Sequence, residues 1–183
     1  MQNSTRNRTK SWAVKLLVGL SVLMLSSCNG TDSGSPVEVR VGGQVPTFSL
    51  KSVDGTTVTS RSLEGNVVVL NFWATWCQPC MGEIPELKEM AAGSGAKVIS
   101  IALDEDGEKA IKPFVARNNI NYVVLVGNQE IFQRFNGIAI PYTLVLDRSQ
   151  RIVHIYRGPV SKESLEQDLK KIEQGVVAAL AGS

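Results

Sequence analysis

The chain has 183 residues, of which 20% are charged and 43% hydrophobic, and its formal net charge at pH 7 is +2. The slight excess of positive charge gives no argument for nucleic-acid binding, because four basic and no acidic residues lie in the first 27 positions, and without them the net charge is −2. The sequence shows no internal repeat and no transmembrane span, so we expect one folded domain and no nucleic-acid partner.

The first 27 residues have the pattern of an export signal. Basic residues precede an apolar stretch from Leu16 to Leu25, which is too short to span a bilayer, and small residues follow. Leu25-Ser26-Ser27-Cys28 resembles the bacterial lipobox, in which cleavage leaves the cysteine lipidated and N-terminal. We therefore expect an exported lipoprotein that is anchored through Cys28 in the inner or the outer membrane and faces the periplasm. Ordinary signal cleavage, with Cys28 incidental, is the alternative.

Three segments follow from this interpretation: signal peptide over 1–27, flexible tether over 28–43 and folded domain over 44–183. The tether is predicted from low hydrophobicity and from Ser, Gly, Asp and Thr around Pro36. Removing 27 residues leaves 156, a common size for a single domain.

The folded part opens with a predicted β-hairpin. Its strands are Val45 to Leu50 and Thr56 to Val58, with Asp54-Gly55 between them. Ser60 to Gly65 is expected to form a turn or a short helix that leads to the central strand.

A buried strand and a pair of cysteines come next. Val67 to Leu70 are four aliphatic residues without polar alternation, which predicts a strand covered on both faces. The run ends at Cys77-Gln78-Pro79-Cys80, whose spacing allows a disulfide across the first turn of a helix. At a helix N-terminus, free N–H groups and the helix dipole lower the pKa of a thiol below its usual value of about 8.5. We therefore expect Cys77 to be exposed and activated, and we assign it as the nucleophile and Cys80 as the resolving thiol.

Two other uses of the cysteine pair remain open. A zinc site needs four ligands, and the chain offers only Cys28 and His154 as further Cys or His residues. A fixed structural disulfide is the second alternative, although so short a loop constrains the unfolded chain little.

Phe72-Trp73-Ala74-Thr75-Trp76-Cys77-Gln78-Pro79-Cys80 resembles the active-site signature of the thioredoxin superfamily, most closely its membrane-anchored TlpA/ResA branch. The resemblance implies an α/β thioredoxin-like fold, with a central mixed sheet flanked by helices and an N-terminal hairpin. It implies a thiol–disulfide oxidoreductase that reduces exported client proteins, with a possible place in cytochrome c maturation. Its electrons would come from a membrane donor of the CcdA/DsbD type, and the redox-active disulfide would be its only redox group.

The remaining predicted elements fit the order of strands and helices in a thioredoxin-like fold. Pro85 lies inside the first predicted helix and Pro113 inside or at the start of the second, and Asn128 is a predicted N-cap. The predicted elements are a helix from Cys77 to Ala92, a strand from Lys97 to Leu103, a helix from Gly107 to Asn119, a strand from Tyr122 to Val126, a helix with Ile131, Phe132 and Phe135 on one side, a hairpin of strands Leu144 to Asp147 and Arg151 to Tyr156, and a helix from Ser161 with Leu165, Leu169, Ile172 and Val176 on one face.

Three residues are expected to bind the client. Ile140-Pro141 before a strand resembles the cis-proline that faces the dithiol in thioredoxin-like proteins, although X-Pro bonds in general are mostly trans. Trp76 adjoins the nucleophile and is expected to shape the docking surface with Ile140 and Pro141, whereas Trp73 fits the core equally well.

A carboxylate is expected to serve the resolving cysteine. Thioredoxins often carry a buried acid at the position of Asn71, which cannot accept a proton. Glu83 stands three residues after Cys80 and matches a glutamate of the TlpA/ResA branch. We expect Glu83 to assist deprotonation of Cys80, with its pKa raised by partial burial beside the apolar residues around Trp76 and Pro141. A solvated helix charge is the alternative.

Two other functional classes share parts of this pattern. A peroxiredoxin has a similar N-terminal hairpin, but its cysteine context differs from Trp73 to Cys77. A Sco-type copper-binding module uses Cys-x-x-x-Cys with a distant histidine, and the single histidine, His154, is interpreted as structural. We therefore expect no metal site.

Overall fold

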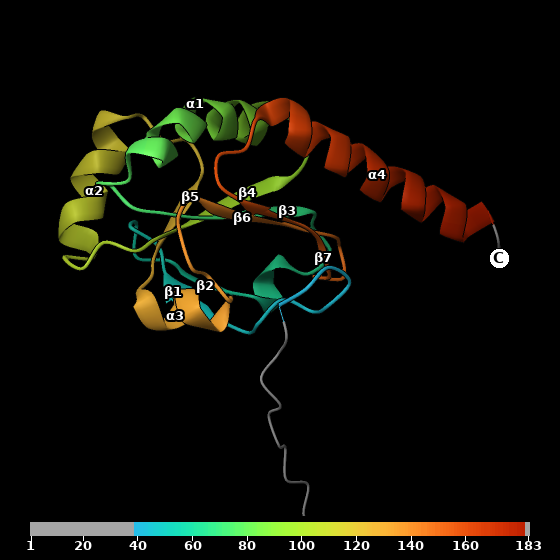
Figure 1. The fold of residues 1–183 in the computed structure, drawn as a ribbon, viewed down its shortest axis with the longest axis horizontal. Helices are drawn as coiled ribbons and strands as arrows, with labels where there is room; N and C mark the ends of the chain where they lie inside the picture. The colour runs from blue at the N-terminus through green and yellow to red at the C-terminus, as the bar shows by residue number, and fades with distance from the viewer. Residues whose placement is uncertain (1–38, 182–183) are drawn as a thin grey trace, which may run out of the picture. The chain divides into compact units, whose positions relative to one another are not determined.

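The computed structural model describes residues 39–181, with side chains up to residue 175. The export signal, Cys28 and residues 28–38 of the expected tether lie outside the described residues. At the centre is a five-stranded mixed sheet in the order β5-β4-β3-β6-β7 (Figure 1). This arrangement confirms the predicted thioredoxin-like α/β fold.

The central strand is the aliphatic run found in the sequence. β3 pairs in parallel with β4, which pairs in parallel with β5, while β6 is antiparallel to both β3 and β7. The parallel pairing of β3 and β4 is the geometry that a crossover connection through a helix produces. The strands are β3 (Val68–Trp73), β4 (Lys97–Ala102), β5 (Val123–Val126), β6 (Tyr142–Leu146) and β7 (Ile152–Arg157).

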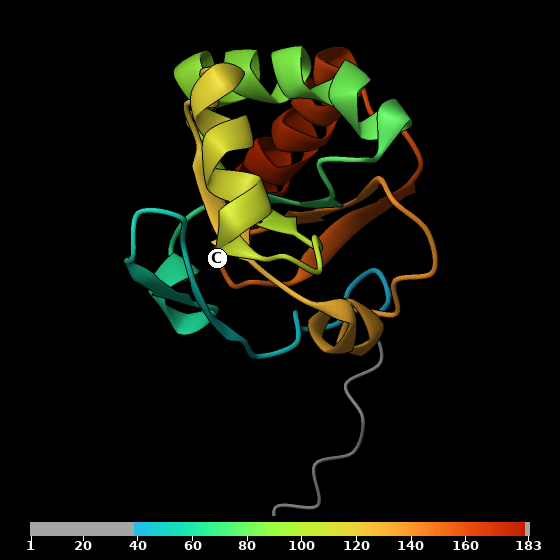
Figure 2. The same cartoon turned by 90° about the vertical axis from the view of Figure 1, so that its left-hand side faces the viewer.

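Helices cover both faces of this sheet (Figures 1 and 2). Helices α1, α2 and α4 lie on one face, and α3 lies on the other with the predicted N-terminal hairpin and a short 3-10 helix. Their bounds are α1 (Gln78–Gly93), α2 (Glu108–Arg117), α3 (Gln129–Arg134), α4 (Lys162–Ala181), hairpin strands β1 (Ser49–Lys51) and β2 (Thr57–Thr59), and the 3-10 helix at Arg61–Leu63.

Alternate side chains of β3 enter two different cores, which explains the absence of polar alternation in its sequence. Leu70 and Phe72 pack with α3 residues such as Phe132 in one cluster. Val69 packs with residues of α1 and α4, such as Leu87, in the other. Each such side chain contributes roughly 1.5–3 kcal/mol when fully buried, so β3 fixes the sheet on which the cysteines are presented.

The folded domain begins earlier than the expected boundary at Gln44. Val39 is 6% exposed and belongs to the core cluster on the α3 side. The Gly42 N–H donates to the Ile152 carbonyl at 2.7 Å, and the Ile152 N–H donates to the Gly43 carbonyl at 2.9 Å. Because this backbone pairs with the start of β7, the tether predicted over 28–43 is too long at its C-terminal end.

Smaller differences concern prolines and element ends. β1 begins at Ser49 instead of Val45, and Pro46 lacks the N–H that a strand pair needs. α2 begins at Glu108 and continues through Pro113, so that proline does not mark its start. No helix within 39–181 combines the length and the apolar character needed to cross a membrane.

The apolar stripe of the last helix is confirmed as far as side chains are described. Leu165, Leu169 and Ile172 are buried in the core beside α1, and the Val176 side chain lies outside the described part. The Asn128 side chain accepts the Ile131 N–H at 2.9 Å and caps α3 as predicted.

Candidate active site

The two cysteines form a disulfide at the N-terminal end of α1, with their Cα atoms 5.3 Å apart. Cys77 is the N-cap residue of this helix, and its Sγ accepts the backbone N–H of Cys80 at 3.3 Å. Once the disulfide opens, this N–H and the positive end of the helix dipole stabilise negative charge on Cys77. Cys80 lies one turn inside the helix, so the geometry favours Cys77 as the nucleophile.

Both cysteines are more buried than the sequence suggested. We expected Cys77 to be exposed, but it is only 4% exposed and Cys80 only 2%. The disulfide sits in an apolar cluster with Trp73 and Ile84, against which Ile140 packs. A client disulfide therefore reaches the dithiol only after docking against the residues around it.

The residues expected to dock the client lie on two loops beside the cysteines. Trp76 is 69% exposed on the turn before α1, and the Ile140–Pro141 bond is cis, as expected. Pro141 itself is buried, and its carbonyl accepts the Gly158 N–H at 2.9 Å. Trp76 and Ile140 are thus available for contact, while Pro141 shapes the loop that carries Ile140.

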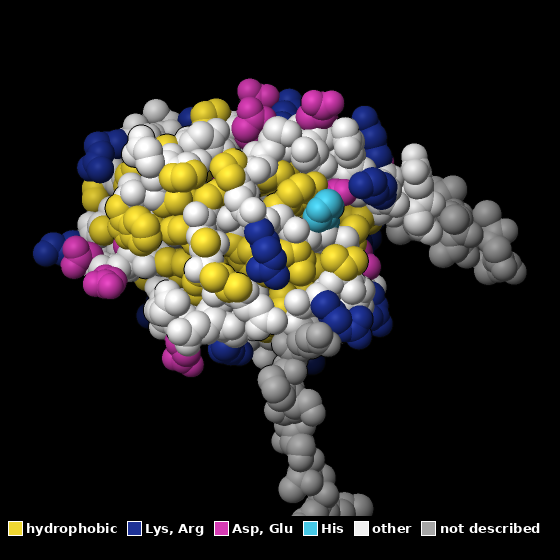
Figure 3. Space-filling view, viewed as in Figure 1, with side chains coloured by type: hydrophobic (Ala, Val, Ile, Leu, Met, Phe, Trp, Pro, Cys, Tyr) yellow, Lys and Arg dark blue, Asp and Glu magenta, His cyan; other side chains and the backbone are white. Residues whose placement is uncertain are grey.

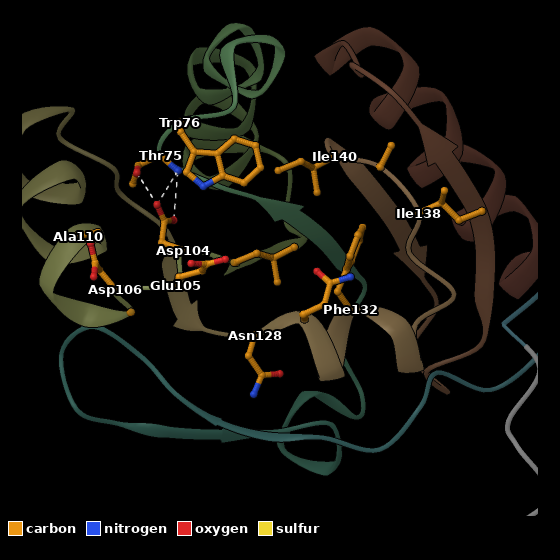
Figure 4. A pocket seen from close by; sticks show the side chains of 15 residues that line it. Thr75, Trp76, Asp104, Glu105, Asp106, Ala110, Asn128, Phe132, Ile138 and Ile140 are labelled. Carbon is orange, nitrogen blue, oxygen red and sulfur yellow. Dashed lines mark hydrogen bonds between the residues drawn. The ribbon is translucent and has the colours of Figure 1, made fainter.

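A groove of about 1090 Å³ opens beside this site (Figure 4). Trp76, Ile138 and Ile140 form an apolar side, and Ile138 is 88% exposed. The opposite side carries the acidic groups of the loop after β4, and no Lys or Arg of the described residues lines the groove. Those acidic groups are Asp104, Glu105 and Asp106.

Asp104 holds the turn that carries Trp76. Its carboxylate is 5% exposed and accepts the Thr75 backbone N–H at 3.1 and 3.2 Å, and it also accepts the Thr75 hydroxyl. Figure 4 shows these bonds at the edge of the groove, below the Trp76 indole. The sequence analysis did not identify this contact.

Glu83 is a buried carboxylate, which excludes the alternative of a solvated helix charge. It is 2% exposed, and Oε1 accepts the Val160 N–H at 2.7 Å while Oε2 accepts from Asn71 Nδ2 at 3.2 Å. Burial raises the pKa of Glu83 to about 7, although the hydrogen bonds from Val160 and Asn71 oppose the shift. Glu83 therefore exchanges a proton near neutral pH, one helical turn beyond Cys80.

The neighbours of Glu83 differ from those we expected. The sequence placed it beside Trp76 and Pro141, but its hydrogen bonds join α1 to β3 and to the segment before α4. Asn71 Nδ2 also donates to Thr143 Oγ1 at 2.9 Å, which fixes the amide. Asn71 thus orients the Glu83 carboxylate, although Asn71 itself stands where thioredoxins often carry a buried acid. Burial is the main cause of the raised pKa of Tyr122, and the charge of Glu83 raises it further.

Two further residues singled out in the sequence have structural roles. Trp73 is 2% exposed in the core, and its indole N–H donates to Ser100 Oγ at 3.1 Å. His154 Nδ1 lies 2.8 Å from Asp168 Oδ2, and the imidazole stacks on Tyr156 at 4.1 Å. His154 thus pairs β7 with α4, as a structural histidine is expected to do.

Comparison with known proteins places this site in a family. A protein-family model described as Redoxin matches residues 40–174, which include both cysteines, Glu83 and Pro141. The chain belongs to the Redoxin family. Within it, the chain is a TlpA/ResA-like member of the thioredoxin superfamily, as the signature around the cysteines predicted.

Individual relatives agree with the family. The thioredoxin-like protein YneN of Bacillus subtilis is 31% identical over 164 residues, which cover 85% of this chain and 96% of YneN. The thiol-disulfide oxidoreductase ResA of Bacillus thuringiensis is 30% identical over 139 residues, covering 74% of this chain and 80% of ResA. A crystal structure of a thiol:disulfide interchange protein from Chlorobium tepidum is 31% identical, with a TM-score of 0.63, and covers 74% of this chain and 98% of that one.

These relationships identify the class of reaction. With a cysteine pair on the N-terminus of α1 and relatives named as thiol–disulfide oxidoreductases, this family member is an enzyme of that class, of the protein-disulfide reductase type.

Sequence reasoning missed the residues that support the site from other elements. Asp104, Thr143 and the Val160 backbone N–H come from the loop after β4, from β6 and from the segment before α4. The only signal in the sequence is the position of Asp104 just beyond the end of a strand next to β3.

Proposed function

We propose that this enzyme reduces disulfides in exported client proteins. The single observation that carries thiol–disulfide exchange at Cys77 is its N-cap position, where the Cys80 N–H stabilises a thiolate at the edge of a groove. The reducing direction is supported by the resemblance to the TlpA/ResA branch. The buried Glu83, with a pKa raised to about 7, supplies a proton acceptor on the same helix.

The reaction runs in two exchange steps. Cys77 thiolate attacks one sulfur of the client disulfide, a mixed disulfide forms, and the other client sulfur leaves as a thiolate. Cys80 then loses its proton, attacks the Cys77 sulfur and expels the second client thiolate. The client gains two electrons, and Cys77 and Cys80 return to the disulfide seen in the structure.

The groove beside the dithiol is the site where the client segment would lie. Trp76 and Ile140 flank it, and both cysteines are nearly inaccessible from outside. Docking against these side chains would bring a client sulfur to Cys77 while the remaining surface of the client stays in solvent. Its apolar side favours clients with exposed apolar residues near the disulfide.

The wider setting of the enzyme follows from the resemblance to the TlpA/ResA branch. We propose that a membrane donor of the CcdA/DsbD type returns electrons to the Cys77–Cys80 disulfide, that this disulfide is the whole redox centre, and that no other cofactor or metal takes part. Clients would include apocytochrome c. We propose no nucleic-acid partner. On the face shown in Figure 3, the basic side chains are scattered and do not form the stripe that is typical of nucleic-acid binding.

Anchoring through Cys28 is part of the proposed setting, on the periplasmic side of the inner or outer membrane. We predict that the mature protein begins at a lipidated Cys28, because Leu25-Ser26-Ser27-Cys28 follows a basic, apolar leader. Mass spectrometry of the mature N-terminus checks this, with Cys28→Ser as the control. A mature protein that begins at another residue would contradict it.

The direct test of the function is a reduction assay with a defined client. The reduced protein is mixed with an oxidised peptide that contains a Cys-x-x-Cys-His segment, and free peptide thiols are counted. We expect one peptide disulfide reduced for each Cys77–Cys80 pair oxidised, and none with a variant in which both cysteines are serine. Oxidation of the reduced peptide by the disulfide form, without the reverse reaction, would overturn the proposal.

A further inference from the structure

The carboxylate of Asp104 is the buried charge that lies against the turn before the nucleophile. Residues Ala74 to Cys77 form this turn, in which the Cys77 N–H donates to the Ala74 carbonyl at 3.1 Å. The Thr75 N–H points out of the turn and donates to both oxygens of Asp104, at 3.1 and 3.2 Å. Asp104 is therefore hydrogen-bonded to Thr75, which stands two residues before Cys77 in the chain.

Few positive charges near the Asp104 carboxylate offset its negative charge. Glu105 and Asp106 of the same loop are also acidic, and Glu83 of α1 is buried beyond Cys80. Within the described residues no Lys or Arg lines the groove, and α2 presents Glu108 and Lys112 paired with each other at 3.0 Å.

The strand beside β6 ends in a cation, Arg157. Its guanidinium lies over the Tyr142 ring, 5.3 Å from the ring centroid. Asp104 accepts hydrogen bonds from the Thr75 N–H and hydroxyl, and within the described residues it forms no ion pair. Because Asp104 is 5% exposed, water screens its negative charge less than it would screen a charge on the surface.

We propose that Asp104 is a positioning residue that fixes the Thr75–Trp76 turn and whose charge keeps the Cys77–Cys80 pair reducing. The N-terminus of α1 stabilises a Cys77 thiolate and, by itself, makes the disulfide easier to reduce. Strong stabilisation of the reduced form produces an oxidant. Asp104 opposes that stabilisation, so the reduced enzyme gives up electrons to a client more readily. This inference rests on the proposed reductive function and adds the residue that sets its strength.

The test compares Asp104→Asn with Glu108→Gln in the full-length protein. Asparagine keeps the size and one acceptor for the Thr75 N–H but removes the charge, whereas Glu108→Gln removes a solvated charge on α2. Each reduced protein is equilibrated with glutathione disulfide, and the rate of Cys77 alkylation is followed against pH. For Asp104→Asn we expect the equilibrium for reducing glutathione disulfide to fall about threefold to tenfold and the thiolate fraction at a fixed pH to rise by a similar factor.

The controls separate charge from folding. Glu108→Gln should match the wild type, and Asp104→Glu, which keeps the charge, should stay closer to the wild type than Asp104→Asn. If Asp104→Asn does not fold, Asp104→Ser, whose hydroxyl can still accept the Thr75 N–H, carries the same expectation. An unchanged equilibrium in the uncharged variants, or an equal change in Glu108→Gln, would overturn the role of Asp104. Either result leaves the reduction of peptides by the wild type untouched, so the proposed function is judged separately.

Discussion

Replacing Cys80 with alanine is expected to trap client proteins on Cys77, and replacing Cys77 with alanine is expected to trap none. Without Cys80 the first exchange still occurs, because the Cys77 Sγ remains the N-cap of α1, but the mixed disulfide has no internal thiol to resolve it. Without Cys77 the remaining thiol is 2% exposed and lacks the N-cap position. Client reduction should fall by about a thousandfold or more in both variants, as removal of a covalent nucleophile does elsewhere.

Non-reducing gels after rapid alkylation make this comparison. The two variants are prepared with Cys28 replaced by serine, so that no third thiol contributes, and a double variant without Cys77 and Cys80 shows the background. High-mass species that disappear on reduction should form only with Cys80→Ala. Equal trapping by both single variants would show that the N-cap geometry does not select the nucleophile.

The second large effect is expected at Glu83. In the second exchange Cys80 must lose a proton, and an unassisted thiol with a pKa of about 8.5 is only a few per cent ionised at pH 7. The pKa of Glu83 is raised to about 7 by burial, so the carboxylate accepts a proton increasingly as pH rises through 7 and is itself protonated below it. We expect Glu83→Gln to slow resolution about tenfold or more at pH 7, and to move the rise of the rate toward pH of about 8.5.

Stopped-flow decay of the mixed disulfide against pH measures this step. Glu86→Gln is the matched control, since Glu86 is an acid of the same helix whose Oε2 accepts the Lys162 N–H at 2.8 Å. Its loss removes a similar contact to the start of α4 without reaching Asn71, so resolution should keep the wild-type pH profile. If Glu83→Gln decays as the wild type does between pH 6 and 9, the carboxylate has only a structural role.

Much of the fold was predictable because its signals are local. The unbroken aliphatic run of β3 predicted a strand covered on both faces, and Asn128 predicted the start of α3. The start of the domain was placed too late, because Gly42 and Gly43 pair with Ile152, more than 100 positions later, and Val39 packs in the core. The polarity of residues 39–43 does not indicate a partner so far along the chain.

The active site also combines features that local sequence predicts with features that depend on distant residues. Cys77, Cys80 and Glu83 follow one another at intervals of three residues, and this spacing together with the resemblance to the TlpA/ResA branch identified them from the sequence. What makes Glu83 useful is its burial against Asn71 and Val160, and Val160 lies 77 positions further along the chain. The raised pKa of that carboxyl follows from tertiary packing, and sequence spacing does not contain it.

The reduction potential of the Cys77–Cys80 pair tests the central claim most directly. It is measured in the full-length protein by equilibration with dithiothreitol and glutathione couples, with the two thiols counted by mass after alkylation. A pair that acts as a reductant should have a value in the range of reducing thioredoxins, about −270 mV, at which it donates electrons to client disulfides. A value near about −120 mV, that of a strong periplasmic oxidant, would contradict it.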